Sequence, residues 1–365
     1  MRALWLQIHR WLGLTLGALG VLVGLSGSVL VFDQRIDALL NPQHYAVSDP
    51  RPALGFAQYA EAAAGSGRAV GIRLPDDTGG PVIVTVRARE GDLFHRVYLD
   101  PTSGRVLGSA PGGGFIGWAH RFHESLALRE YWGRGLVGLV GAAMLASSLS
   151  GIYLWWPGRR RMRQAFGLRP GLATSRNLHY VLGLYLSLAL ALLSFTGLWL
   201  AYADAGRRLA AAFGPLSPAP RSVQAPEAPG TRLRLPPDAA VDAARTLYPD
   251  ATVTSLGLPG GPRGVYRVNL RRTNERIAVF VSPASGAVLW RTDGATQTSG
   301  DAFLALQRAL HSGETFGLPG RVLFFLTGLL PAILVGTGTM MWLRERRRAT
   351  ISPAAATADQ PGGGS

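Results

Sequence analysis

Four of the seven histidines form two pairs at matching places along the chain. His9 opens HRWLGL and His179 opens HYVLGL, each at the start of a long apolar stretch. His123 and His311 each lie nine or ten residues before a Gly-Arg pair that leads into another apolar stretch. Two imidazoles from facing helices can occupy both axial positions of a haem iron, an arrangement suited to electron transfer. The spacing therefore favours two bis-histidine haem sites.

Simpler roles compete with haem ligation. A single histidine at a membrane edge is usually a surface residue whose ring reaches the interface, and only the recurrence of the feature weakens that interpretation. His120 lies three residues before His123 on the same helical face, so either is a candidate ligand. Zinc needs three or four ligands, and no acidic cluster accompanies these histidines. His44 and His95 are expected to be ordinary loop and strand residues.

Four stretches without charged residues must position the histidines: 12–32, 135–156, 180–203 and 322–343. Each has 21 to 24 residues, which at ~1.5 Å per residue spans the roughly 30 Å core of a bilayer. The sequence therefore predicts four transmembrane helices. The first stretch could also be a cleaved signal peptide, but it is long for one and its pattern recurs at 179, so a retained helix is expected.

The first apolar stretch carries glycines at 13, 17, 20, 24 and 27, all on the helix face that continues from His9. Such a groove of bare backbone serves either as a packing seam for another helix or as a place where a flat, bulky group lies against the helix. Gly183 repeats the position of Gly13 relative to His179. The sequence leaves both interpretations open.

All 37 basic residues are arginine, and their location matters more than the net charge of +15. The connection 157–178 carries six arginines and no acid, and the tail after 343 begins RERRR. Positive charge marks the cytoplasmic side of membrane proteins, so both termini and this connection are expected there, with the two long loops outside. The charge is therefore not a sign of nucleic-acid binding. The absence of cysteine excludes disulfides and iron–sulfur clusters.

The two long loops, 33–133 and 204–321, repeat one plan. Each has a helical segment, strand-like segments and a turn, and YLDPTSGRVLG at 98–108 matches FVSPASGAVLW at 280–290. Each loop ends in a surface helix before the next apolar stretch. The chain is therefore an internal duplication whose halves share one orientation, which argues against an inverted-repeat transporter.

These motifs resemble the PepSY-associated transmembrane-helix family over nearly the whole chain. The outer units are similar to PepSY domains. Members of the family include iron-regulated inner-membrane proteins and ferric-siderophore reductases that carry b-type haem. The resemblance rests on HRWLGL at 9–14, SGIYLWWP at 150–157, HYVLGLYL at 179–186 and LHSGETFGLPGR at 310–321.

The resemblance implies a membrane α-helical fold of four transmembrane helices with two extracytoplasmic α+β PepSY-like domains. It implies His9, His179, His123 and His311 as the iron ligands of two haem b groups, with His120 as an alternative to His123. The expected segments are a first transmembrane helix (1–32), a periplasmic PepSY-like domain (33–116), a surface helix with the second transmembrane helix (117–157), a basic cytoplasmic connection (158–178), a third transmembrane helix (179–203), a linker with the second PepSY-like domain (204–300), a surface helix with the fourth transmembrane helix (301–343), and a disordered cytoplasmic tail (344–365).

The function implied is that of an oxidoreductase in the bacterial inner membrane. Electrons would enter at the cytoplasmic haem, pass to the outer haem and reduce a ferric-siderophore or similar iron complex in the periplasm, for iron acquisition. No nucleotide-binding fold is expected, so the donor would be a flavin, a flavoprotein or quinol. A different class of protein competes with this one: a PepSY binding or regulatory protein without redox activity, which restrains a protease or senses envelope peptides.

Overall fold

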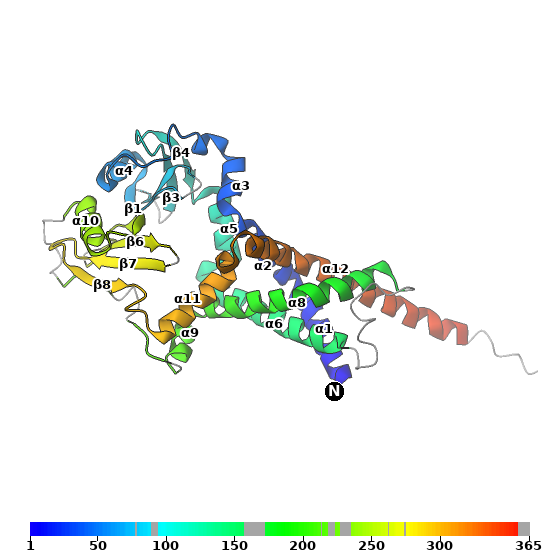
Figure 1. Ribbon diagram of the computed structural model, residues 1–365. Coiled ribbons are helices and arrows are strands. Elements are labelled where there is room, and N and C mark those ends of the chain that lie inside the picture. Colours follow the sequence, from blue (N-terminus) through cyan, green and yellow to red (C-terminus); the bar gives the residue numbers. More distant parts are fainter. Residues whose placement is uncertain are drawn as a thin grey trace, which may run out of the picture. The chain divides into compact units, whose positions relative to one another are not determined.

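Two units make up the computed structural model, and each is described by itself (Figure 1). The helical unit comprises Met1–Phe32, Ala119–Arg208 and Leu304–Ser365, and the sheet unit comprises Asp33–Trp118 and Leu209–Phe303. The structure describes residues 1–76, 79–88, 94–156, 172–212, 214–217, 223–226, 235–261, 263–273 and 275–356.

The helical unit contains the long apolar helices that the sequence predicts. α6 (Gly133–Trp155), α8 (Thr174–Ala201) and α12 (Gly317–Ala356) each carry a segment long and apolar enough to cross a membrane. α1 (Arg2–Thr15) and α2 (Gly17–Val31) supply a fourth segment if the bent pair counts as one span. The described residues therefore hold three or four candidate membrane spans.

The first apolar stretch is bent, whereas the sequence predicts one straight helix. α1 and α2 meet at Leu16 with a bend of 61°. The hydroxyl of Thr15 donates to the carbonyl of Trp11 at 2.7 Å, a contact that bends helices. Gly17 also lets Val335 of α12 approach the backbone at the same point. The bend divides the glycine stripe, because His9 and Gly13 belong to α1 and the later glycines to α2.

Most of the stripe in α2 is a helix-packing seam. A Cβ atom at Gly24 would lie 2.5 Å from the carbonyl oxygen of Gly328 in α12, and one at Gly20 would lie 2.7 Å from the sulfur of Met144 in α6. The packing interpretation therefore applies to these glycines. Gly13 differs, because a Cβ atom there would meet nothing within 4 Å.

Two helix ends differ from the sequence prediction. α8 begins at Thr174, so His179 lies inside the helix and not at its start. α12 continues to Ala356, where the sequence predicts a disordered tail from 344. Arginine and alanine are frequent in that segment and are strong helix formers. Most of the expected basic connection, 158–178, lies outside the described residues.

The sheet unit holds one antiparallel sheet in the order β4-β3-β2-β1-β5-β6-β7-β8. The sequence predicts two separate α+β domains, but the structure joins them, because β1 pairs with β5 and sets Ile72 opposite Leu256. The strands are β1 (Arg68–Arg73), β2 (Val82–Arg87), β3 (Phe94–Leu99), β4 (Val106–Pro111), β5 (Thr252–Gly257), β6 (Tyr266–Arg272), β7 (Glu275–Val281) and β8 (Val288–Thr292).

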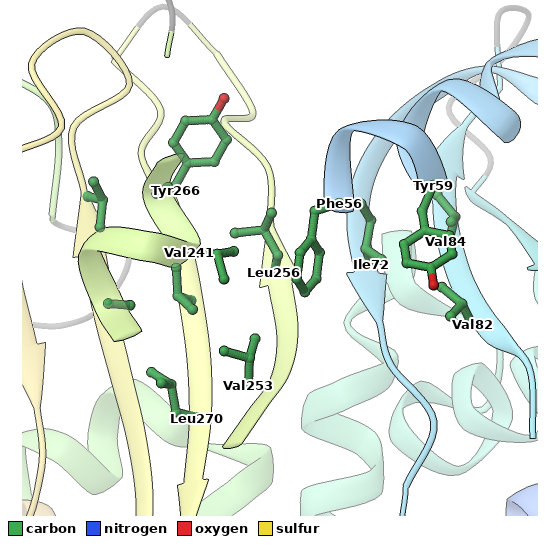
Figure 2. Packing of buried hydrophobic residues seen from close by; sticks show 14 of the residues in the cluster. Phe56, Tyr59, Ile72, Val82, Val84, Val241, Val253, Leu256, Tyr266 and Leu270 are labelled. Carbon is green, nitrogen blue, oxygen red and sulfur yellow. The ribbon is translucent and has the colours of Figure 1, made fainter. Parts of the chain in front are cut away.

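One hydrophobic core is shared by both halves of the sheet (Figure 2). α4 (Phe56–Ala62) contributes Tyr59, and α10 (Pro237–Leu247) contributes Val241. Asp238 of α10 accepts hydrogen bonds from the backbone N–H groups of Phe56 and Ala57 at 2.6 and 2.9 Å. Asp238 therefore caps α4.

Shorter helices connect these elements. Two of them directly follow long helices in the chain, and several are single turns. They are α3 (Asp33–Leu40), η1 (Pro42–Tyr45), η2 (Ala64–Ser66), η3 (Arg129–Tyr131), α9 (Ala203–Ala210) and η6 (Glu314–Phe316).

Candidate functional site

His9 and His179 face each other in the helical unit. His9 comes from α1 and His179 from α8, and their ring centres lie 6.2 Å apart with the ring planes at 89°. Both side chains are half-buried. The structure thus brings together the first pair of histidines that the sequence singles out.

His123 and His311 form the second pair. They lie in the last turns of α5 (Gly114–Ser125) and α11 (Ser299–Ser312), the amphipathic helices that precede α6 and α12. Their ring centres are also 6.2 Å apart, with the ring planes at 42°. His123 makes the ring contact with His311, which favours His123 as the candidate ligand.

The spacing within both pairs fits two imidazoles on opposite sides of one metal ion. Two metal–imidazole bonds of about 2 Å each, together with the distance from each nitrogen to its own ring centre, separate the ring centres by roughly 6 Å. Both observed separations, 6.2 Å, match this value. The donor set is also suitable, because two neutral imidazoles are an axial ligand set for haem iron.

The hydrogen bonds of the four imidazole rings leave Nε2 of each ring free to coordinate a metal. Within the described residues, the hydrogen-bond contacts of these four rings are made by Nδ1. His9 Nδ1 lies 3.1 Å from the carbonyl oxygen of Ser147, and His123 Nδ1 lies 2.9 Å from that of Val23. His179 and His311 use Nδ1 for threonine hydroxyl contacts of 3.0 Å. Nε2 is therefore the nitrogen available for coordination in each ring, and the outer contacts hold the ring orientation.

These partners of Nδ1 are not predicted from the sequence. A signal was nevertheless present, because a serine or threonine followed by glycine occurs in each of the four long apolar stretches, and twice in 322–343. Without the structure, nothing links these dipeptides to particular histidines. Those that contact a histidine pair are Ser26-Gly27, Ser150-Gly151, Thr196-Gly197 and Thr337-Gly338, and the fifth is Thr327-Gly328.

Two arginines beside the apolar stretches, Arg10 and Arg321, form contacts away from the histidine pairs. Arg10 forms a salt bridge with Glu345 at 2.8 Å. Arg321 donates to the carbonyl oxygen of Val31 at 2.8 Å and lies over the ring of Phe32. Neither contact is with a histidine pair, so these side chains add helix-to-helix links.

The two remaining histidines belong to the sheet unit. His44 stacks on Tyr98 with ring centres 4.5 Å apart, and His95 pairs with Val86 and Pro111 within the sheet. Among the described residues, no three His, Cys, Asp or Glu side chains gather as metal ligands. In the described part of the chain, the ligand sets that stand out are thus the two histidine pairs.

Comparison with known proteins places the chain in a family. The family model described as PepSY-associated TM region matches residues 6–345. No curated protein matches the chain. The match covers both histidine pairs, the complete sheet unit and all but the outermost residues of the candidate membrane spans. The chain therefore belongs to the family of PepSY-associated transmembrane regions.

Proposed function

We propose that the protein is a haem-b reductase of the bacterial inner membrane that passes electrons to a ferric-siderophore or similar iron complex in the periplasm. The observation that carries the proposal is the equal 6.2 Å separation of two histidine pairs that hold their Nδ1 atoms in the same way. A single pair at this distance could arise by chance between two surface histidines. Two pairs with the same separation favour a common ligand. The electron donor would be a flavin, a flavoprotein or quinol.

His9 and His179 would hold one haem b, and His123 and His311 a second. A haem with two imidazole ligands supplies one-electron transfer without an open iron position. The residues of this chain would bind and orient the haem groups. The helices place the two rings of each pair opposite each other, and the Nδ1 contacts fix which nitrogen each ring presents. Gly13, one turn after His9, keeps the helix surface open beside that pair.

The absorption spectrum of the purified protein tests this proposal. A Soret band is expected, with sharp α and β bands after reduction, because two imidazoles give low-spin iron. Anaerobic addition of a ferric siderophore to the reduced protein is expected to restore the oxidised spectrum. An iron-free siderophore is the control. A colourless protein would contradict the proposal and favour the non-redox binding or regulatory protein.

The proposed orientation places both termini in the cytoplasm and the sheet unit in the periplasm. Alkaline phosphatase, which is active only outside the cytoplasm, is therefore expected to be active when inserted after Leu216 and inactive when inserted after Arg176. An insertion after Gly104 is expected to behave like that after Leu216, because the bent pair α1–α2 would cross the membrane once. Activity after Arg176 would reverse the charge argument and the direction of electron flow.

A further inference from the structure

Each of the four long apolar segments has a hydroxyl–glycine dipeptide that contacts one candidate ligand, and α12 has a second dipeptide, Thr327-Gly328. In the first half, Ser26 of α2 contacts His123, and Ser150 of α6 contacts His9, with Oγ–Nδ1 distances of 3.4 and 3.0 Å. In the second half, Thr196 of α8 contacts His311, and Thr337 of α12 contacts His179, both at 3.0 Å. Each histidine thus has its own dipeptide, supplied by another helix of the same half.

The partner of the hydroxyl proton decides whether the threonine donates to the histidine ring or accepts from it. Thr337 Oγ1 donates to the carbonyl oxygen of Ile333 at 2.6 Å, and Thr196 Oγ1 donates to that of Leu192 at 2.8 Å. A hydroxyl has one proton, so while it donates to the backbone carbonyl oxygen it accepts a hydrogen bond from a histidine N–H. In this arrangement Nδ1 is the protonated nitrogen of His179 and His311.

The two serines work in the same way. Ser26 Oγ donates to the carbonyl oxygen of Leu22 at 2.9 Å, and Ser150 Oγ donates to that of Ser147 at 3.1 Å. His9 and His123 also approach backbone carbonyl oxygens, which only accept. All four rings are thereby held as the tautomer with hydrogen on Nδ1 and a lone pair on Nε2.

The glycine of each dipeptide sets the position of the ring. A Cβ atom at Gly27 would lie 2.8 Å from Cε1 of His123, closer than real contacts allow. The corresponding distances are 3.1 Å at Gly197, 3.3 Å at Gly151 and 3.4 Å at Gly338. Alanine would therefore displace the ring most at Gly27 and least at Gly338.

We infer that the four dipeptides are positioning elements for the haem ligands: the hydroxyl selects the tautomer that presents Nε2, and the glycine lets the ring reach its place. The inference rests on the proposed haem function. An Nδ1–H that donates to an oxygen makes the imidazole a stronger electron donor, which stabilises ferric iron. Losing the hydroxyl should then raise the reduction potential of the haem concerned and weaken its binding.

Thr337→Val tests this inference, because it removes the hydroxyl and keeps the shape of the side chain. Outer-shell changes of this kind typically weaken binding roughly 10–100-fold. Release of one haem to apomyoglobin is therefore expected to become at least about 10-fold faster, and the potential of that haem alone should rise. Thr196→Val should shift the other haem. Thr337→Ser should restore the original potential.

Thr327→Val is the matched control. Thr327 lies in the same helix, is fully buried, and donates to the carbonyl oxygen of Leu323 at 2.8 Å. It should leave both potentials unchanged. If Thr337→Val and Thr327→Val gave the same result in a protein that carries two haems, the positioning role would be wrong and the haem function would stand. A wild-type protein without haem would overturn both.

Discussion

Alanine in place of His179 is expected to remove the haem of the His9–His179 pair and leave that of the His123–His311 pair. One axial ligand of the affected haem would be lost, so its affinity should fall by more than the roughly 10–100-fold typical of an outer-shell change. The haem content should fall from two per chain to one. A pyridine haemochrome assay measures the content, and a redox titration identifies the remaining centre.

The partner histidine, His9, provides a second test of the same site. His9→Ala is expected to match His179→Ala, and the double variant should be little worse than either single one, because both residues serve one site. The ferric EPR spectrum distinguishes the sites, since imidazole planes at 89° give a more anisotropic low-spin signal than planes at 42°. Full haem content with unshifted potentials in both single variants would remove these histidines as ligands.

His120→Ala is the matched control for the second pair. His120 lies in the same helix, but His123 makes the contact with His311. His123→Ala should therefore cost the second haem, whereas His120→Ala should retain it. The opposite order would assign the ligand to His120.

Asp100→Ala is expected to destabilise the sheet unit strongly. Asp100 is fully buried and accepts five hydrogen bonds: from the N–H and hydroxyl of Ser48 at 2.7 and 2.8 Å, from the N–H of Thr102 at 3.1 Å, and from the N–H and hydroxyl of Ser103, both at 3.0 Å. Hydrogen bonds to a charged group contribute about 1.5–3 kcal/mol each, and water can reach the exposed donor residues after the change, so the free energy of unfolding should fall by about 1.5–3 kcal/mol. Faster hydrogen exchange in β3 of the full-length protein would report the loss.

The second half of the chain supplies the control. Ser282 occupies the equivalent turn, is also fully buried, and accepts from the N–H groups of Ala284 and Ser285 at 3.2 Å. Asp100→Ser should therefore keep the turn and lose mainly the contacts with Ser48. Its effect should fall between those of the wild type and Asp100→Ala. Equal exchange in all three proteins would contradict a structural role for the carboxylate.

The same carboxylate predicts how stability depends on pH. The hydrogen bonds from Ser48 and Ser103 hold the pKa of Asp100 well below its usual value. A lowered folded-state pKa stabilises the fold above the unfolded-state pKa, which is about 4, and this contribution is lost as the pH falls below that value. The protection of β3 should therefore decrease in acid in the wild type and less so in Asp100→Ser.

The sequence predicts features that local spacing determines. The apolar stretches reveal the membrane helices, and the repeat pairs His9 with His179 because both open the same motif. The contact between β1 and β5 could not be predicted in this way, because it joins segments about 180 residues apart. The alternation of side chains along each strand does not indicate which strand lies beside it. The bend at Leu16 and the partners of Nδ1 likewise depend on contacts between helices, which no single segment encodes.

The arrangement of the histidines is what a chain that arose from two copies of a shorter polypeptide would show. Each pair takes one histidine from either half, and the sheet joins its halves through antiparallel neighbours, the kind of self-complementary contact found in two-fold symmetric dimers. A half-length chain would have one candidate ligand of each proposed site and complete neither alone, whereas two copies would complete both. The protein is in this sense a tethered dimer. Its tether has let the two copies diverge, with serine beside the ligands of the first and threonine beside those of the second.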